Sequence, residues 1–202
     1  MFPDLLRDDV FRLETKRLWL RWPRASDATE IARLAADADI AGATAHIPHP
    51  YPAEAAIAFV LRARRENSDG KSAAFIVTAK RRPSVPLGAI SLGDAGRGKL
   101  VLGYWLGKPY WNRGMITEAA GAMVEFAFTW TAAAEIVAAA PVVNSASRRV
   151  LEKYGFGFVE QALKEAPERP SPLLCNFFSL RREDWRGREV AAASAEPSLE
   201  GL

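Results

Sequence analysis

One stretch, residues 102–119, constrains the fold of this chain more than any other. It begins as an apolar segment, continues through an aromatic turn that ends at Gly114, and then starts an amphipathic helix. The first residues of a helix expose backbone N–H groups without partners inside the helix, and the helix dipole adds positive potential there. A glycine lets a ligand approach the backbone closely, so the junction suits a phosphate or pyrophosphate. Taken alone, the pattern is equally consistent with an ordinary connection between a strand and a helix.

Composition narrows the class of protein. The chain has 202 residues, 49% hydrophobic and 25% charged, which is typical of one folded domain with a substantial core. A net charge of +3 is too small to indicate a nucleic-acid partner. No apolar run reaches the roughly twenty residues that cross a bilayer, and the first residues are acidic where a secretory signal is basic. We therefore expect a cytoplasmic protein with no membrane partner.

Cysteine and histidine are scarce. The single cysteine, Cys175, excludes an intrachain disulfide and lies in an apolar segment, where a packed core residue is expected. His46 and His49 stand without a cysteine cluster, so we predict no metal site.

The apolar periodicity predicts a mixed α/β domain, because short strands come first and strands and helices then alternate. We expect Ser26 to cap the first helix and residues 46–52, which hold three prolines, to form a loop. Helices are expected from about residue 26, over 53–67, after Gly114 and over 144–154, and strands over 11–22, 73–80, 87–92, 99–106, 136–143, 156–161 and 173–180.

The same pattern sets the expected domain boundaries. Residues 1–10 form an N-terminal extension and residues 11–188 a single domain. Residues 189–202 have little apolar surface to bury, so we expect a disordered tail.

A second informative segment spans residues 144–156. Asn144 can cap a helix by accepting a hydrogen bond from an N–H two or three residues on, and Gly155 can end that helix. Val150, Leu151 and Tyr154 would then face the core. By itself, this is an ordinary amphipathic helix.

Together the two segments resemble the GNAT acetyltransferase superfamily, and within it the branch of ribosomal-protein alanine N-acetyltransferases. Further matching stretches, in the family's order, are Leu-Glu-Thr-Lys-Arg-Leu at 13–18, Pro-Tyr-Pro at 50–52 and Leu-Arg-Arg-Glu-Asp-Trp at 180–185. The resemblance implies a mostly antiparallel central sheet, splayed between its middle strands, with helices on both faces. It also implies acetyl-CoA as cosubstrate, entering the gap between those strands, and no metal.

The family's phosphate loop follows the pattern Gln/Arg-x-x-Gly-x-Gly/Ala, which falls on residues 111–116. Ile116 departs from the usual small residue; a side chain turned into the core would leave its N–H available. Arg113 either adds charge to the phosphates or is a solvated loop residue. The residues that the resemblance assigns to the cofactor are Trp105, Leu106, Trp111, Asn112, Arg113, Gly114, Met115, Ile116, Thr117, Asn144 and Ser147.

For catalysis, the resemblance implies a strand bulge at residues 103–105 and an oxyanion donor at a backbone N–H within 104–106. Many relatives use a tyrosine four residues before the Gly-Phe pair as general acid, and that position is Leu151 here. In the ribosomal-protein branch a serine three residues after the asparagine is the candidate, which is Ser147. A serine hydroxyl is a weak acid, so we expect it to orient or relay a proton to the thiolate. Asn144 would hold the pantetheine or the acceptor.

The general base stays open. Asp94, Glu118, His46 and Tyr104 are candidates, directly or through water. Bulk water is a further one, because an α-amine has a reference pKa of about 8.

Three functions fit these observations. The first is acetyl transfer to a protein N-terminal α-amine by direct attack in a ternary complex, with His46 and Tyr51 bordering the acceptor. The second is the same chemistry on a small-molecule amine. The third is a catalytically weak CoA-binding regulatory module, which draws on Leu151, Ile116 and the missing base. Apolar residues in the last strands would also allow a homodimer.

Overall fold

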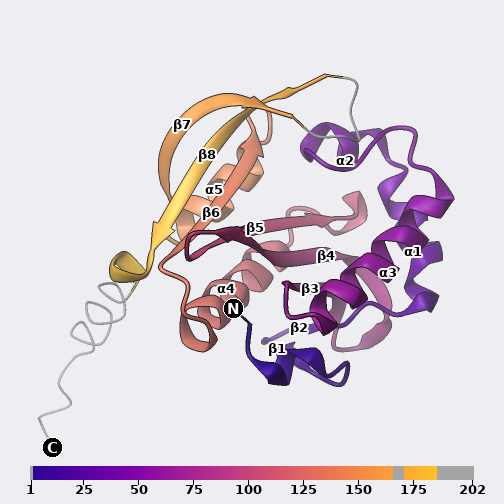
Figure 1. Ribbon diagram of the computed structural model, residues 1–202. Helices are drawn as coiled ribbons and strands as arrows, with labels where there is room; N and C mark the ends of the chain where they lie inside the picture. The colour runs from indigo at the N-terminus through magenta and orange to yellow at the C-terminus, as the bar shows by residue number, and fades with distance from the viewer. Residues whose placement is uncertain (1, 166–170, 186–202) are drawn as a thin grey trace, which may run out of the picture.

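The computed structural model describes residues 2–165 and 171–185 and places every strand in one eight-stranded sheet (Figure 1). The strand order is β1-β2-β3-β4-β5-β6-β8-β7, and only β5 and β6 pair in parallel. The mixed α/β domain that the sequence pattern predicts and the mostly antiparallel sheet that the resemblance implies are therefore confirmed. The tail expected at 189–202 lies outside the described residues. The strands are β1 (Arg12–Glu14), β2 (Leu18–Arg21), β3 (Ser72–Ala79), β4 (Arg82–Gly96), β5 (Lys99–Leu106), β6 (Glu135–Pro141), β7 (Gly157–Lys164) and β8 (Leu173–Arg181).

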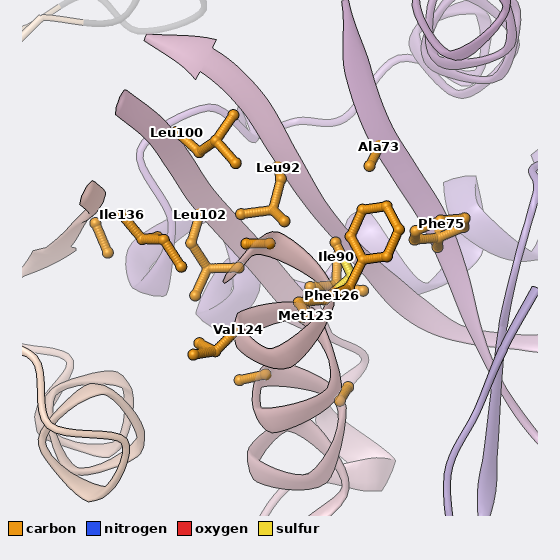
Figure 2. Packing of buried hydrophobic residues seen from close by; sticks show 14 of the residues in the cluster. Ala73, Phe75, Ile90, Leu92, Leu100, Leu102, Met123, Val124, Phe126 and Ile136 are labelled. Carbon is orange, nitrogen blue, oxygen red and sulfur yellow. The ribbon is translucent and has the colours of Figure 1, made fainter. Parts of the chain in front are cut away.

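Helices cover both faces of this sheet. On one face α4 (Met115–Trp130) packs against the strands, with Met123 and Phe126 directed toward Ile90 and the neighbouring apolar residues (Figure 2). On the other face α1 (Ala28–Ala35) and α3 (Ala53–Ser68) cover Ile76 and its neighbours. Successive strand residues point to opposite faces, so β3 is buried on both sides and reads as a continuous apolar run.

The sheet splays between β5 and β6. Their parallel pairing ends at Leu102 and Ala138. Beyond that point β6 stays paired with β8, and β5 stays paired with β4 as far as Leu106. Each strand follows its antiparallel neighbour, so the two separate, and Figure 1 shows β6, β8 and β7 leaning away from β5 and β4.

The prediction of a strand bulge at residues 103–105 is wrong. The register between β4 and β5 is regular from the Gly88–Leu106 pair to the Asp94–Leu100 pair, and it shifts only at the hairpin end. The gap therefore comes from the end of strand pairing and not from an extra residue in β5.

The N-terminal part differs from the expectation in two ways. Residues 11–22 form the hairpin β1–β2 and not one strand, because Thr15 turns the chain through backbone and side-chain bonds to Leu18. Ser26 is not the helix cap. The buried Asp27 carboxylate accepts the Arg24 N–H at 2.7 Å and forms an ion pair with Arg21, also at 2.7 Å.

Residues 2–10, which we expected as an extension before the domain, pack against its core. Phe2 and Leu6 are buried in the main core, and the Leu6 carbonyl accepts the indole N–H of Trp22 at 3.1 Å. A short 3-10 helix, Asp4–Arg7, carries Leu6 into that position.

The other expected elements are present, with ends shifted by a few residues. β4 is the exception, since it extends well beyond 87–92 at both ends. A separate short helix, α2 (Ala38–Ala43), follows α1. The helix α5 (Ser145–Lys153) begins at Asn144 and ends before Gly155, whose φ of +87° suits a glycine. Within residues 2–165 and 171–185, every helix is too short or too polar to span a lipid bilayer.

Candidate active site

The turn before α4 exposes a helix N-terminus. Asn112 and Gly114 both adopt the left-handed conformation, with φ of +58° and +68°. No side chain caps the helix, and the Glu118 N–H is the first to bond back, to the Gly114 carbonyl at 3.1 Å. The N–H groups of the first turn before Glu118 therefore have no partner inside the helix. Ile116 packs its side chain against the core, the orientation that leaves its backbone N–H available to a ligand.

A cavity of about 670 Å³, here called the loop-side cavity, opens in front of this helix start. The indole N–H of Trp111 donates to the Leu106 carbonyl at 2.7 Å and ties the loop to the end of β5. Every residue that the resemblance assigns to the cofactor lines this cavity. The sequence reading missed α2, which forms one wall, and the cations Arg149 and Lys153 of α5.

The start of α5 meets β5 at the gap. The Asn144 side-chain oxygen accepts the Ser147 N–H at 2.9 Å, and its amide N–H₂ donates to the Ala43 carbonyl at 2.9 Å. Asn144 thus caps α5, as predicted, and also ties it to α2. The Ser147 Oγ lies 2.9 Å from the phenol oxygen of Tyr104.

The Tyr104 phenol is mostly buried. Burial raises its pKa to about 12, and the hydrogen bond with Ser147 acts in the opposite, lowering direction. The phenol is therefore protonated at neutral pH and can donate to Ser147.

Two backbone N–H groups of β5 face the gap. The Gly107 N–H donates to the Leu87 carbonyl of β4 at 2.8 Å. In an antiparallel ladder the N–H groups of every second residue point to the same neighbouring strand, so the Trp105 N–H also points to β4. The N–H groups of Tyr104 and Leu106 point to the other side, where β6 no longer pairs. The geometry thereby narrows the expected oxyanion donor from residues 104–106 to two of them.

A second cavity of about 500 Å³, here called the α3-side cavity, lies on the opposite face of the sheet. His46 and Tyr51, the residues expected to border the acceptor, both line it. It follows β5 from Trp105 to Val101, which is about 13 Å at ~3.3 Å per residue. Its lining from β3, β4 and β5 includes the small residues Ala74, Ala89, Ser91, Gly93 and Gly103, beside the larger Val101 and Trp105.

The two cavities meet at the splayed part of the sheet. Six residues line both of them: Ala43, Thr44, Tyr104, Trp105, Asn144 and Ser147. The two cavities therefore adjoin along β5, the end of α2 and the start of α5.

Of the four candidate bases, His46 and Tyr104 line the α3-side cavity. Asp94 is exposed in the β4–β5 hairpin and accepts the Gly96 N–H. Glu118 accepts hydrogen bonds from Thr15 and Arg17, and it lines neither cavity. Burial alone would raise the pKa of Glu118, but these bonds outweigh burial and lower it. Neither Asp94 nor Glu118 lines either cavity.

The sequence reading missed Glu66 of α3. This half-buried carboxylate lines the α3-side cavity together with Arg62 and Lys164. On a helix of mixed polar and apolar residues, a glutamate gives no signal of this role, because it reads as part of the solvated face.

No three His, Cys, Asp or Glu side chains gather as a metal site would require, within the part of the chain that the structure describes.

Comparison with known proteins decides the family. A model of the GNAT acetyltransferase domain matches residues 17–157, more than half of the chain. This chain belongs to the GNAT acetyltransferase family. It is therefore an N-acetyltransferase, and the resemblance to the GNAT superfamily read from the sequence is confirmed.

Solved structures of the same fold include three informative ones. RimL, a ribosomal L7/L12 alpha-N-protein acetyltransferase in complex with coenzyme A, is 14% identical with a TM-score of 0.74, over 86% of this chain and 99% of that chain. The ribosomal-protein-S5-alanine acetyltransferase of Vibrio fischeri is 21% identical with a TM-score of 0.73, over 87% and 98%. The microcin C7 self-immunity acetyltransferase MccE, in complex with acetyl-CoA and AMP, is 18% identical with a TM-score of 0.70, over 82% and 93%.

These identities are low, so the likeness concerns the fold. Among curated proteins, none matches the sequence.

Proposed function

We propose that this GNAT member transfers the acetyl group of acetyl-CoA to a protein N-terminal α-amine, by direct attack within a ternary complex. The observation that carries the proposal is the meeting of two cavities at the gap between β5 and β6. A donor in the loop-side cavity and an amine in the α3-side cavity can touch there without a covalent enzyme intermediate.

The loop-side cavity suits coenzyme A. The unpartnered N–H groups of the first turn of α4 and the positive end of the helix dipole suit its pyrophosphate. Arg149 and Lys153 add positive charge at the same cavity. RimL and MccE, which share this fold, have structures with coenzyme A and acetyl-CoA, and this supports the assignment.

At the reacting centre, the N–H groups of Tyr104 and Leu106 stabilise the negative charge that develops on the thioester oxygen. The leaving thiolate receives a proton from the Ser147 hydroxyl, which the Tyr104 phenol supports at 2.9 Å. The pKa of Tyr104, about 12, lies above the roughly 8.5 of a reference thiol, so a net transfer that leaves a phenolate is unfavourable. The pair therefore relays the proton that the attacking nitrogen gives up.

The missing strong base favours an α-amine as acceptor. With a reference pKa of about 7.7–8.0, about a tenth of an N-terminal amine is neutral at pH 7, whereas a lysine side chain with a reference pKa of about 10.4 is almost fully charged. A protonated amine must also lose one proton before it attacks. His46 and Glu66, which both line the α3-side cavity, are our candidates to accept that proton.

The shape of the α3-side cavity supports an extended acceptor. Its length of about 13 Å along β5 matches about four residues of an extended peptide. The small residues between Val101 and Trp105 in its lining leave room for a backbone to lie beside the strand. The similarity in fold to RimL, an alpha-N-protein acetyltransferase of ribosomal L7/L12, agrees with this choice.

A small-molecule amine is the second candidate. The volume of about 500 Å³ also falls within the range of small-molecule sites. The likeness to MccE, an immunity acetyltransferase crystallised with AMP, favours this alternative.

One experiment separates the candidates. The purified protein is incubated with acetyl-CoA and with peptides that begin with Ala or Ser, and released thiol and peptide mass are recorded. The matched control is the same peptide with a blocked N-terminus and an internal lysine. Polyamines and free amino acids form the small-molecule panel. Acetylation of the free N-terminus alone supports the proposal.

Turnover of small amines without turnover of any peptide would replace it with the second candidate. Binding of CoA with no transfer to any amine would indicate a regulatory CoA-binding module instead.

A further inference from the structure

Glu118 sets an electrostatic problem for the proposed pyrophosphate site. It lies in the first turn of α4, four residues after Gly114, and its side chain is only 17% exposed. An acidic residue in the first turn stabilises a helix. The same negative charge, however, opposes a pyrophosphate at that helix end, because like charges repel most strongly where water is partly excluded.

Arg17, in the turn between β1 and β2, answers this problem. Its Nε donates to Glu118 Oε2 at 2.6 Å, and its backbone N–H donates to Glu118 Oε1 at 2.7 Å. The Thr15 hydroxyl donates to the same Oε1 at 2.6 Å. The carboxylate is thus neutralised and held from a hairpin about one hundred residues away in the sequence.

The same guanidinium reaches the loop itself. Arg17 Nη1 donates to the Arg113 carbonyl at 3.0 Å, and Nη2 lies 3.5 Å from the position that a Cβ on Gly114 would occupy. Only the fork of an arginine presents separate N–H groups to a carboxylate and to a carbonyl in one plane. Arg17 therefore joins Glu118 to the residues that shape the helix start.

We propose that Arg17 is a positioning residue for the pyrophosphate of acetyl-CoA: it cancels the charge of Glu118 and fixes the carbonyl of Arg113, so that the start of α4 keeps its affinity for an anion. This proposal rests on the proposed function. A purely stabilising role fits less well, because the Arg17 side chain is 46% exposed and exposed ion pairs contribute little to stability.

The test uses the full chain and the variants Arg17→Gln, Glu118→Gln and the double variant Arg17→Gln/Glu118→Gln. Lys16→Gln is the matched control, since it removes one positive charge from an exposed side chain of the same turn. The dissociation constant of CoA is measured by calorimetry at low and high salt. The kcat/KM is measured with acetyl-CoA and with S-acetylpantetheine, which lacks the pyrophosphate.

We expect Arg17→Gln to weaken CoA binding about tenfold at low salt, and less at high salt, where charges are screened. Lys16→Gln should stay within about twofold of the wild type, on the same screening argument. The double variant should recover most of the lost affinity, because the unpaired carboxylate is gone. The kcat/KM for S-acetylpantetheine should not change in Arg17→Gln.

Arg17→Lys covers the case in which Arg17→Gln does not fold. It keeps the charge but loses the fork, so an intermediate loss of CoA affinity, about threefold, is expected.

Two results would overturn this proposal alone. One is wild-type affinity for CoA in both Arg17 variants. The other is a loss in Arg17→Gln that Glu118→Gln does not rescue and that appears equally with S-acetylpantetheine, which would indicate a structural role only. A wild-type protein that does not bind CoA would overturn the proposed function as well.

Discussion

The two cavities on either side of the β5–β6 gap are built in different ways. The loop-side cavity is lined largely by two runs of consecutive residues, 110–117 and 143–147, the first of which holds the start of α4. The α3-side cavity is formed by residues scattered over α3, five strands (β3 to β7), the start of α5 and the segment 43–51. A short motif encodes the backbone geometry at the centre of the first cavity. No short motif brings together the side chains that line the second.

The largest effect is expected at the backbone of the loop-side cavity. Gly114→Val places a β-branched residue at φ +68° and disturbs the start of α4, so CoA affinity should fall about a hundredfold. Gly96→Val is the matched control, because Gly96 has φ +76°, lies in open space and lines neither cavity. Calorimetric titration of CoA measures both. A loss confined to acceptor binding would contradict the assignment of this loop.

The next effect is expected where the two cavities meet. Ser147→Ala removes the hydroxyl beside Tyr104 and should lower kcat at least about tenfold, with little change in CoA affinity. Tyr104→Phe should act in the same direction, and the double variant should be no worse than the poorer single one if the two hydroxyls form one relay. Steady-state kinetics decide this. Unchanged turnover in Ser147→Ala would remove Ser147 from the mechanism.

A smaller effect, on the acceptor and not on CoA, is expected in the α3-side cavity. A Cβ on Gly103 would lie 3.6 Å from the Ser91 Oγ, an ordinary contact, and Gly103 lines that cavity, so we expect the side chain of Gly103→Leu to extend into it. We expect the KM for the acceptor to rise about fivefold, as for a filled pocket, with CoA affinity unchanged. Wild-type acceptor KM in this variant would show that the acceptor does not lie along β5.

The smallest effect concerns how the loop-side cavity is anchored. The pKa of Glu118 is lowered in the folded chain from an ordinary value of 4.5. The unfolded chain therefore binds the proton more tightly, so the stabilisation is complete above about 4.5 and is lost as pH falls through the folded pKa. The loss should be about 1 kcal/mol, because Arg17 is partly exposed.

Denaturant unfolding between neutral and acidic pH measures this loss. The Glu118→Gln variant should show a flatter decline. An equally steep decline in that variant would mean that Glu118 does not anchor the loop through its charge.

The residues of the loop-side cavity are easier to predict from the sequence than those of the α3-side cavity. Local patterns predict the turn at Gly114 and the helix cap Asn144, since turns and caps depend on residues a few positions apart, whereas Trp111 is assigned to the loop through the resemblance. His46 and Tyr51 were also predicted, through the resemblance. Glu66 was not, because its position in the cavity depends on how α3 lies across the sheet.

The sequence by itself determined the order of strands and helices, the helix start at Gly114 and the capped helix after Asn144, because periodicity and local hydrogen bonding specify them. Only the tertiary structure decided that β5 and β6 separate without a bulge, and that residues 11–22 form a hairpin. It alone brought Tyr104 against Ser147 and Arg17 against Glu118. These contacts join residues 43 and 101 positions apart, and a local pattern carries no information about such a distant partner until the sheet and its helices are packed.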